Sequence, residues 1–300
     1  MEAEDNISTV IQFVLLGFSD LPNLQALLFG VFSIIYIIIL TGNSLTIILS
    51  RLDPALQKPM YFFLANFFSL EICYSSFPKC RSAFSQNKSI SYHSCAQQFY
   101  IFCAFADTKS FILAAMAYDH YVAICTPLLY TAVMCRDICI WLIVLSYFGG
   151  NMSSLVHTSF TFILKYCDKD VINHFFFLDT SLIEWLLSTY SSSVEIICFL
   201  VIIISYFYIL LSVLKIHSSS GRKKTFFTCT SHLTSVAIYQ GTLLFVYSRP
   251  SYLYSPNTDK IISVFYTIII PVLNPLIYSL RNRDIKDASK KVLEPKIHPS

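Results

Sequence analysis

The chain has 300 residues, of which 55% are hydrophobic and only 13% are charged, and its formal net charge is +3. Soluble globular proteins contain roughly 25% charged residues, so the composition excludes an ordinary water-soluble protein. A small positive charge suits a membrane surface with anionic lipid headgroups. It gives no support to binding of nucleic acid.

Apolar stretches recur along the whole sequence. A helix needs about 20 mainly apolar residues to cross a bilayer, and such stretches lie near 24–50, 59–78, 96–125, 138–164, 183–214, 225–247 and 261–280. The sequence therefore predicts an all-α membrane protein, a single seven-transmembrane domain over residues 1–300. Basic and apolar residues alternate from Arg281 to Val292, which predicts a short C-terminal amphipathic helix on the inner leaflet.

The orientation follows from the basic residues. Lys and Arg near span ends are retained on the cytoplasmic side, and they are more frequent on the segments that face the same side as the tail 281–300. We therefore expect a multi-pass protein with residues 1–23 outside. The acidic start predicts no cleaved signal peptide, and Asn6-Ile7-Ser8 is a glycosylation sequon on the outer tail.

Seven short motifs fall in order on the predicted spans and loops. They are Gly42-Asn43, "PMYFFLANFFSLEICY" from Pro59, "MAYDHYVAIC" from Met116, "INHFF" from Ile172, Ser205-Tyr206, "KKTFFTCTSHL" from Lys223 and "PVLNPLIYSLRN" from Pro271. In this combination the chain resembles an odorant receptor of the rhodopsin-like G-protein-coupled family. The resemblance implies a seven-helix bundle in the plasma membrane that binds a small volatile, mostly apolar odorant in its outer half. It also implies a heterotrimeric stimulatory G protein at the inner face, which raises cyclic AMP.

Other classes have less support. A transporter or channel is one alternative, because intramembrane charges also line ion and proton paths. Many transporters contain an inverted repeat of spans, and this sequence shows none. We find no P-loop glycine pattern, nucleophile elbow or histidine pair at metal spacing. The sequence therefore predicts neither an enzyme nor a metal or cofactor site.

Ionisable residues inside a span are costly, so each is a candidate functional residue. The resemblance places an acid at the position of Lys109, close to the carboxylate of Glu71, where two acids could share a sodium ion. With lysine at this position, we expect Glu71 and Lys109 to form a direct ion pair instead, and the sodium site is not carried over.

The ligand side is predicted from the resemblance and from helical spacing. Asp107 shares a helix face with Cys103 and Ser110. Asp107 is either an anchor for an amine or hydroxyl group or a protonated acid bonded to a neighbouring helix, and the same two alternatives hold for Glu195. The predicted ligand-binding residues are Phe102, Cys103, Phe105, Asp107, Ser110, Gln240, Leu243 and Tyr247.

Histidine replaces arginine in the third-span motif. The family usually has arginine after the acid at Asp119, and here His120 stands there. Arginine is always charged, whereas histidine is mostly neutral at cytosolic pH. Either the change weakens both the contacts that hold the resting state and the site for the G protein, or neighbouring residues carry the coupling to the G protein. The predicted coupling and activation residues are Asp119, His120, Tyr121, Tyr206, Asn274, Pro275 and Tyr278.

The second outer loop is shorter than the family pattern. A segment with two cysteines that normally follows "INHFF" is absent after Phe176, so the usual partners of Cys95 and Cys167 are missing. These two cysteines either bond to each other or stay free, depending on their separation. Together with His120 and Lys109, the short loop supports an alternative function class, a signalling-deficient or poorly folded receptor-like product.

Overall fold

The computed structural model describes residues 12–14, 22–84, 89–164, 180–215, 222, 229–230, 232–242, 269–281 and 283–293. Helices dominate these ranges. They are α1 (Pro22–Leu52), the short 3-10 helix η1 (Pro54–Leu56), α2 (Pro59–Phe84), α3 (Tyr92–Cys125), α4 (Tyr130–Val133), α5 (Arg136–Leu164), α6 (Thr180–Leu214), α9 (Ile270–Arg281) and α10 (Arg283–Leu293). Residues 229–230 and 232–242 are also helical and are called the sixth segment below.

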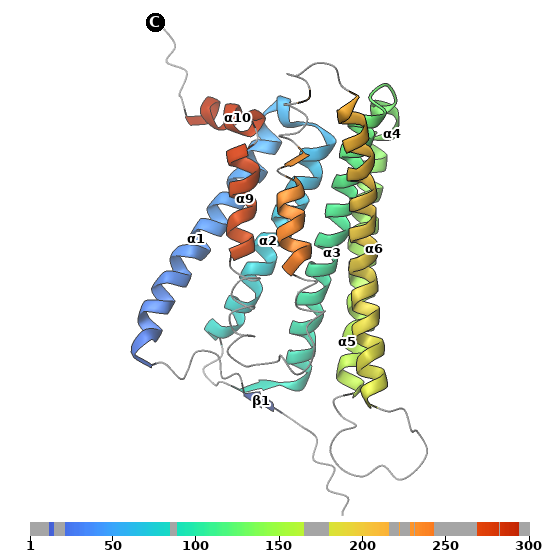
Figure 1. Ribbon diagram of the computed structural model, residues 1–300. Coiled ribbons are helices and arrows are strands. Elements are labelled where there is room, and N and C mark those ends of the chain that lie inside the picture. Colours follow the sequence, from blue (N-terminus) through green and yellow to red (C-terminus); the bar gives the residue numbers. More distant parts are fainter. Residues whose placement is uncertain are drawn as a thin grey trace, which may run out of the picture.

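The long helices run side by side as an elongated bundle (Figure 1). α3 contacts α2, α5 and α6, and α1 contacts α2 and α9, so α3 lies at the centre. The first five predicted spans correspond to α1, α2, α3, α5 and α6, with ends that differ by a few residues. The sixth and seventh predicted spans are described only in part.

The surface of the bundle is apolar and its interior carries polar groups. Within the described residues, four helical stretches are long and apolar enough to cross a membrane: Ser33–Leu52, His93–Cys125, Arg136–Phe162 and Ser193–Leu214. Large apolar side chains such as Ile197 and Phe207 on α6 are exposed, while Asn43, Glu71 and Lys109 are buried. This arrangement suits a lipid surrounding, because lipid tails do not penalise exposed apolar side chains.

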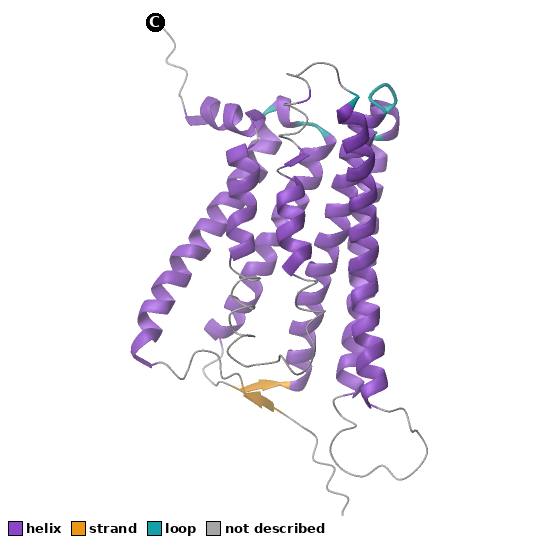
Figure 2. Cartoon of the chain, in the orientation of Figure 1, coloured by secondary structure: helices purple, strands orange, loops and turns teal. Residues whose placement is uncertain are grey.

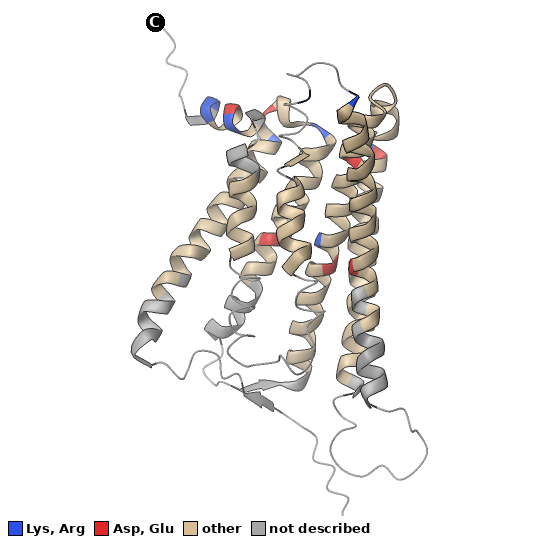
Figure 3. Ribbon diagram, in the orientation of Figure 1, with Lys and Arg blue, Asp and Glu red and all other residues tan. Residues whose placement is uncertain are grey.

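α10 leaves the bundle at a sharp angle and lies across one end of it (Figure 1). It contacts α1, η1 and α9, and it buries Ile285 and Ala288. Lys291 on α10 lies 3.1 Å from Asp53 Oδ2, and Asp53 also caps η1 through the N–H of Ala55 at 2.9 Å. Basic residues are visible along α10 (Figure 3), in agreement with the predicted amphipathic helix.

Two short strands lie at the opposite end of the bundle (Figure 2). β1 (Gln12–Val14) pairs antiparallel with β2 (Ser89–Ser91), and Phe13 is the partner of Ile90. The sequence analysis did not predict these strands. Three residues are too few to show a strand periodicity, and the pairing ties the N-terminal region to the residues that immediately precede α3.

The helix α5 continues through Gly149 and Gly150 without a break. A Cβ atom added to Gly150 would contact Thr108 Oγ1, would lie 2.8 Å from the backbone N of Thr108 and would lie 3.0 Å from the carbonyl of Ala104. The glycine therefore allows α5 and α3 to approach closely, as small residues do in membrane bundles.

Candidate functional site

A buried ion pair joins α2 to α3 near the middle of the bundle. Lys109 Nζ lies 3.3 Å from Glu71 Oε1, and both side chains are almost completely buried. The ammonium group also lies 3.8 Å from the centre of the Tyr74 ring, a favourable cation–π position. The structure thus brings together the two residues that the sequence paired.

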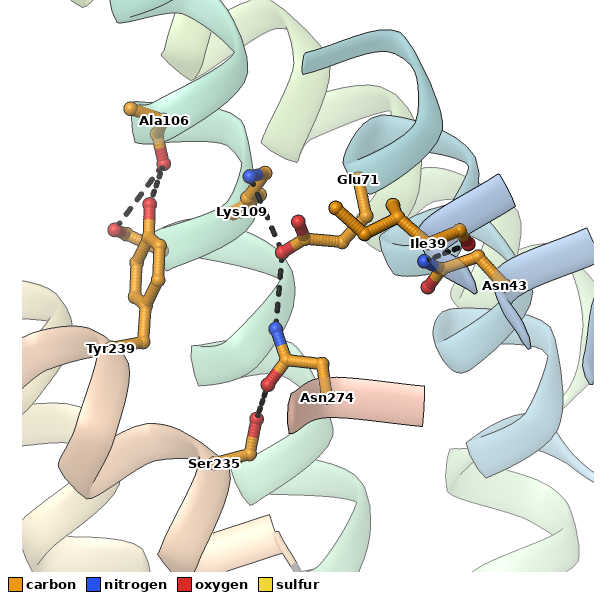
Figure 4. A network of polar contacts seen from close by, with 9 residues as sticks. Ile39, Asn43, Glu71, Ala106, Lys109, Ser235, Tyr239 and Asn274 are labelled. Carbon is orange, nitrogen blue, oxygen red and sulfur yellow. Dashed lines mark hydrogen bonds and ion pairs between the residues drawn. The ribbon is translucent and has the colours of Figure 1, made fainter. Parts of the chain in front are cut away.

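Two further segments are connected to this ion pair (Figure 4). Asn274 on α9 donates a hydrogen bond to Glu71 Oε1 at 3.1 Å, and Ser235 in the sixth segment donates to Asn274 Oδ1 at 2.8 Å. Glu71 Oε1 therefore accepts from both Lys109 and Asn274. The polar network extends over four elements, α2, α3, α9 and the sixth segment.

Neighbouring polar groups bond to backbone carbonyls instead. Asn43 on α1 donates to the carbonyl of Ile39 at 2.7 Å, and Tyr239 donates to the carbonyl of Ala106 on α3 at 2.7 Å. Figure 4 shows both contacts beside the ion pair. Tyr239 is a second connection between the sixth segment and α3, which holds these two elements at a fixed distance.

At the end of the bundle that carries α4, Asp119 is bonded to a tyrosine. The hydroxyl of Tyr130 on α4 donates to Asp119 Oδ1 at 3.0 Å. Burial and the nearby Asp119 raise the pKa of Tyr130 above its usual value, so the phenol keeps its proton and remains the donor. A buried carboxylate needs such a partner, and here α4 supplies it.

His120 contacts the sixth segment through its ring. Its Nδ1 lies 2.6 Å from the carbonyl of Met116, so this nitrogen carries the proton and donates. The ring is stacked on that of His232, with centroids 5.1 Å apart and planes inclined by 15°. His232 Nδ1 in turn lies 2.7 Å from the hydroxyl of Tyr206 on α6. These three rings connect α3, α6 and the sixth segment.

The remaining predicted activation residues are spread over the same end. Tyr121 is half-buried and lies near Tyr208, with ring centroids 6.0 Å apart. Pro275 is buried, and its ring lies 3.4 Å from the position that a Cβ atom of Gly42 would occupy. The side chain of Tyr278 is outside the described part of the structure.

A second buried polar group lies between α3 and α6. Ser110 Oγ lies 2.9 Å from both carboxylate oxygens of Glu195, and both residues are buried. Asp107, one turn from Ser110 on α3, is half-buried. Figure 3 shows acidic positions on α3 and α6 at the same level of the bundle.

Other predicted ligand residues on α3 face different neighbouring helices. Cys103 Sγ lies 3.7 Å from His157 Nδ1 on α5, and the Phe102 ring lies 5.0 Å from that of Tyr74. Phe105 is half-buried and Gln240 is fully buried. Leu243 and Tyr247 fall outside the described residues.

The modification predictions are not tested. Cys95 is half-buried and forms no disulfide with a cysteine of the described ranges, while Cys167 and Asn6 fall outside these ranges, so the disulfide and the glycan stay predictions. In the described ranges no group of three or more His, Cys, Asp or Glu residues is arranged to hold a metal ion.

Sequence reasoning missed several partners in these networks. Tyr130, Ser235 and Tyr239 are common residue types in a span or loop, and nothing in their spacing marks them. His232 belongs to the motif "KKTFFTCTSHL", whose letters alone assign it no contact. A histidine inside an apolar span was a usable signal, because polar residues there need a partner.

Comparison with known proteins identifies the family. A family model described as olfactory receptor matches residues 32–296. Olfactory receptor 5I1 of Homo sapiens is 68% identical over 314 residues, which cover 100% of both chains. Olfactory receptor-like protein OLF1 of Canis lupus familiaris is 68% identical over 310 residues, 99% of this chain and 100% of the relative. Olfactory receptor 5AR1 of Mus musculus is 45% identical over 306 residues, 98% and 99% of the two chains.

These matches cover almost the entire chain and give the alternative, a receptor-like product without signalling, no support. The 314-position alignment is longer than this 300-residue chain, so that relative has residues that the present chain lacks. A helical, multi-pass membrane architecture agrees with the described helices and with the family. The chain belongs to the olfactory receptor family of G-protein-coupled receptors and is a receptor, not an enzyme.

Proposed function

We propose that this receptor lies in the plasma membrane with its N-terminal tail outside, binds small volatile odorants and activates a heterotrimeric stimulatory G protein that raises cyclic AMP. The observation that carries the proposal is the 68% identity to olfactory receptors over the full chain. Residues 1–300 act as one seven-transmembrane domain, with the tails 1–23 and 281–300 on opposite sides.

The ligand is held among helices α3 and α6 and the sixth segment. Apolar lining suits a mostly apolar odorant, because such sites gain affinity by burying apolar surface. The buried polar groups of Ser110 and Gln240 support this assignment, and the side chains of Phe102 and Phe105 are half-buried on α3. The proposed contact residues are Phe102, Cys103, Phe105, Asp107, Ser110, Gln240, Leu243 and Tyr247.

Coupling to the G protein is assigned to the end of the bundle that carries α4 and α10. The stack of His120 on His232 and the contact of Tyr206 with His232 support it, because they join the three elements that would have to separate to admit a partner. The proposed coupling residues are Asp119, His120, Tyr121, Tyr206, Asn274, Pro275 and Tyr278. Glu71 and Lys109 hold the resting arrangement.

The test is a cyclic AMP assay in transfected cells against a panel of volatile compounds. We expect at least one odorant to raise cyclic AMP in cells that express the chain at their surface. His120→Arg is expected to raise the maximal response, because arginine offers five donors and a permanent charge to the G-protein site. Surface-expressed protein that stays silent in both forms would refute the coupling.

A loop-restored variant separates folding from signalling in the same assay. Restoring the missing segment after Phe176 is expected to raise surface expression, because the two added cysteines supply the usual partners of Cys95 and Cys167. A higher cyclic AMP response with unchanged surface staining would contradict this account of the loop and point to ligand contact instead.

A further inference from the structure

A pair of carboxylates with no basic partner lies between α3 and α6. Ser110 donates to Glu195, with Oγ 2.9 Å from each carboxylate oxygen. Asp107 lies three residues before Ser110 on the same face of α3, so both acids belong to the same side of this helix. Within the described part of the chain, neither acid forms an ion pair with Lys or Arg.

A glutamine beside these acids is incompletely bonded. Gln240 has no exposed surface, and neither Nε2 nor Oε1 has a hydrogen-bond partner among the described residues. Its amide lies near Glu195, but not in a position that gives a hydrogen bond of ordinary geometry. A buried amide without partners costs free energy, so this side chain is suited to a ligand that fills its hydrogen bonds.

The one lysine nearby in sequence is committed elsewhere. Lys109 lies 3.3 Å from Glu71 Oε1 and 3.8 Å from the centre of the Tyr74 ring. Residues two positions apart on a helix do not face each other, so Lys109 points away from Asp107. Among the described residues, Lys109 is therefore not placed to pair with Asp107 or Glu195.

We infer that the Asp107–Glu195 cluster, made of Asp107, Ser110, Glu195 and Gln240, binds the ammonium group of a small amine with an apolar body. An ammonium group donates three hydrogen bonds and carries the charge that the acids lack. Gln240 Oε1 accepts one of these bonds. The inference rests on the proposed function and narrows its ligand class.

The test compares matched ligands on the purified full-length chain in lipid nanodiscs, without a G protein. Hexylamine and hexanol share one skeleton, as do benzylamine and benzyl alcohol, and their affinities are measured by ligand-observed NMR. We expect each amine to bind more tightly than its alcohol by roughly tenfold or more, because hydrogen bonds to charged groups are stronger than neutral ones.

Substitutions assign the preference to the cluster. Glu195→Gln and Asp107→Asn are each expected to weaken amine binding by roughly tenfold to a hundredfold while alcohol binding changes little. Asp53→Asn is the matched control, because it removes an acid at the far end of the bundle and leaves the cluster intact. If either cluster variant does not fold, the comparison of amine with alcohol on the unchanged chain decides whether the inference holds.

The outcomes are distinguishable from failure of the proposed function. Equal binding of amine and alcohol, or absence of amine binding, overturns the inference whatever the cyclic AMP assay shows. Amine binding that depends on Glu195 upholds the inference even if no cyclic AMP response follows, in which case the proposed coupling fails alone.

Discussion

Lys109 carries a positive charge in a part of the bundle that excludes water. Its side chain is 2% exposed and that of its partner Glu71 is 0% exposed, so each charge has lost its hydration. The second carboxylate oxygen, Glu71 Oε2, has no hydrogen-bond partner among the described residues. The hydrogen bond from Asn274 and the cation–π contact with the Tyr74 ring therefore offset much of the free energy lost when the two charges leave water.

Removing one member of this pair is expected to destabilise the receptor strongly. Lys109→Met or Glu71→Gln alone should lower the free energy of unfolding by about 3–5 kcal/mol, because the ion pair is broken inside the bundle. The double variant Glu71→Gln/Lys109→Met should recover most of the loss, since the introduced glutamine still accepts from Asn274. Thermal unfolding in detergent ranks the unfolding temperatures of the unchanged chain, the two single variants and the double variant.

Ser69→Ala is the control for this series, because Ser69 also lies on α2 and donates only to the carbonyl of Ala65. It should change the unfolding temperature little. A single Lys109→Met variant as stable as the unchanged chain would contradict the role of the ion pair.

At the scale of elements, the packing of α5 on α3 depends on one glycine. Gly150 is next to Thr108 and Ala104, and the nearest atoms there include backbone atoms that cannot move aside. Gly30 on α1 offers a comparison, because a Cβ atom there would meet nothing within 4 Å. Both glycines are inside helices.

The two glycines are therefore expected to respond oppositely to alanine. Gly150→Ala should lower the free energy of unfolding by about 1–3 kcal/mol, since overpacking forces α5 and α3 apart. Gly30→Ala should raise the free energy of unfolding by up to about 1 kcal/mol, since alanine is a better helix former than glycine. Unfolding temperatures of both variants check this, and equal shifts in one direction would refute the packing argument.

The attachment of α10 should be insensitive to pH near neutrality. Hydrogen bonds from the N–H of Ala55 and from Lys291 lower the pKa of Asp53. A carboxyl with a lowered pKa stabilises the fold above its unfolded pKa of roughly 3.9, and loses this effect as pH falls through the lowered value. Hydrogen exchange of α10 should therefore show equal protection between about pH 5 and pH 8.

Asp53→Asn serves as the variant in the same measurement. It should weaken protection of α10 slightly at every pH in this window, because an exposed ion pair contributes little. Protection that falls steeply between the two ends of the window would show that another titrating group controls the attachment.

The sequence predicted the elements better than their contacts. Long apolar stretches located α1, α2, α3, α5 and α6 within a few residues, because crossing a bilayer demands length and apolarity in one continuous segment. The pair of Glu71 and Lys109 was expected, since intramembrane charges need partners. The contacts of Asp119 with Tyr130 and of His120 with His232 depend on helix rotation and packing, which spacing along the chain does not determine.

Across the whole molecule, polar groups face inward and large apolar side chains face outward. Glu195, His232 and Gln240 are buried, whereas Ile34 on α1 and Trp141 on α5 are 62% and 61% exposed. Such a distribution is unfavourable in water and favourable in lipid, where every polar group has to be satisfied internally. It agrees with the positions of the first five predicted spans, which correspond to α1, α2, α3, α5 and α6.

The proposed topology is tested at the N-terminal tail. A receptor with this tail outside should carry a glycan on Asn6, so Asn6→Gln should increase mobility on a gel and remove sensitivity to a glycosidase. Asn87→Gln is the control, because the sequence predicts that the sequon Asn87-Lys88-Ser89 lies in a short outer loop close to the bilayer and is unmodified. Epitope tags that place both termini in one compartment would refute the seven-span topology.

The Lys109 ammonium is a counter-ion that belongs to the chain itself. A diffusing cation leaves its site when the surrounding medium becomes dilute, but a side chain keeps the same local concentration in every medium. The contacts among α2, α3, α9 and the sixth segment should therefore persist unchanged from low to high ionic strength. The positive charge beside Glu71 is therefore supplied by the chain and does not depend on the ions in the fluid around the cell.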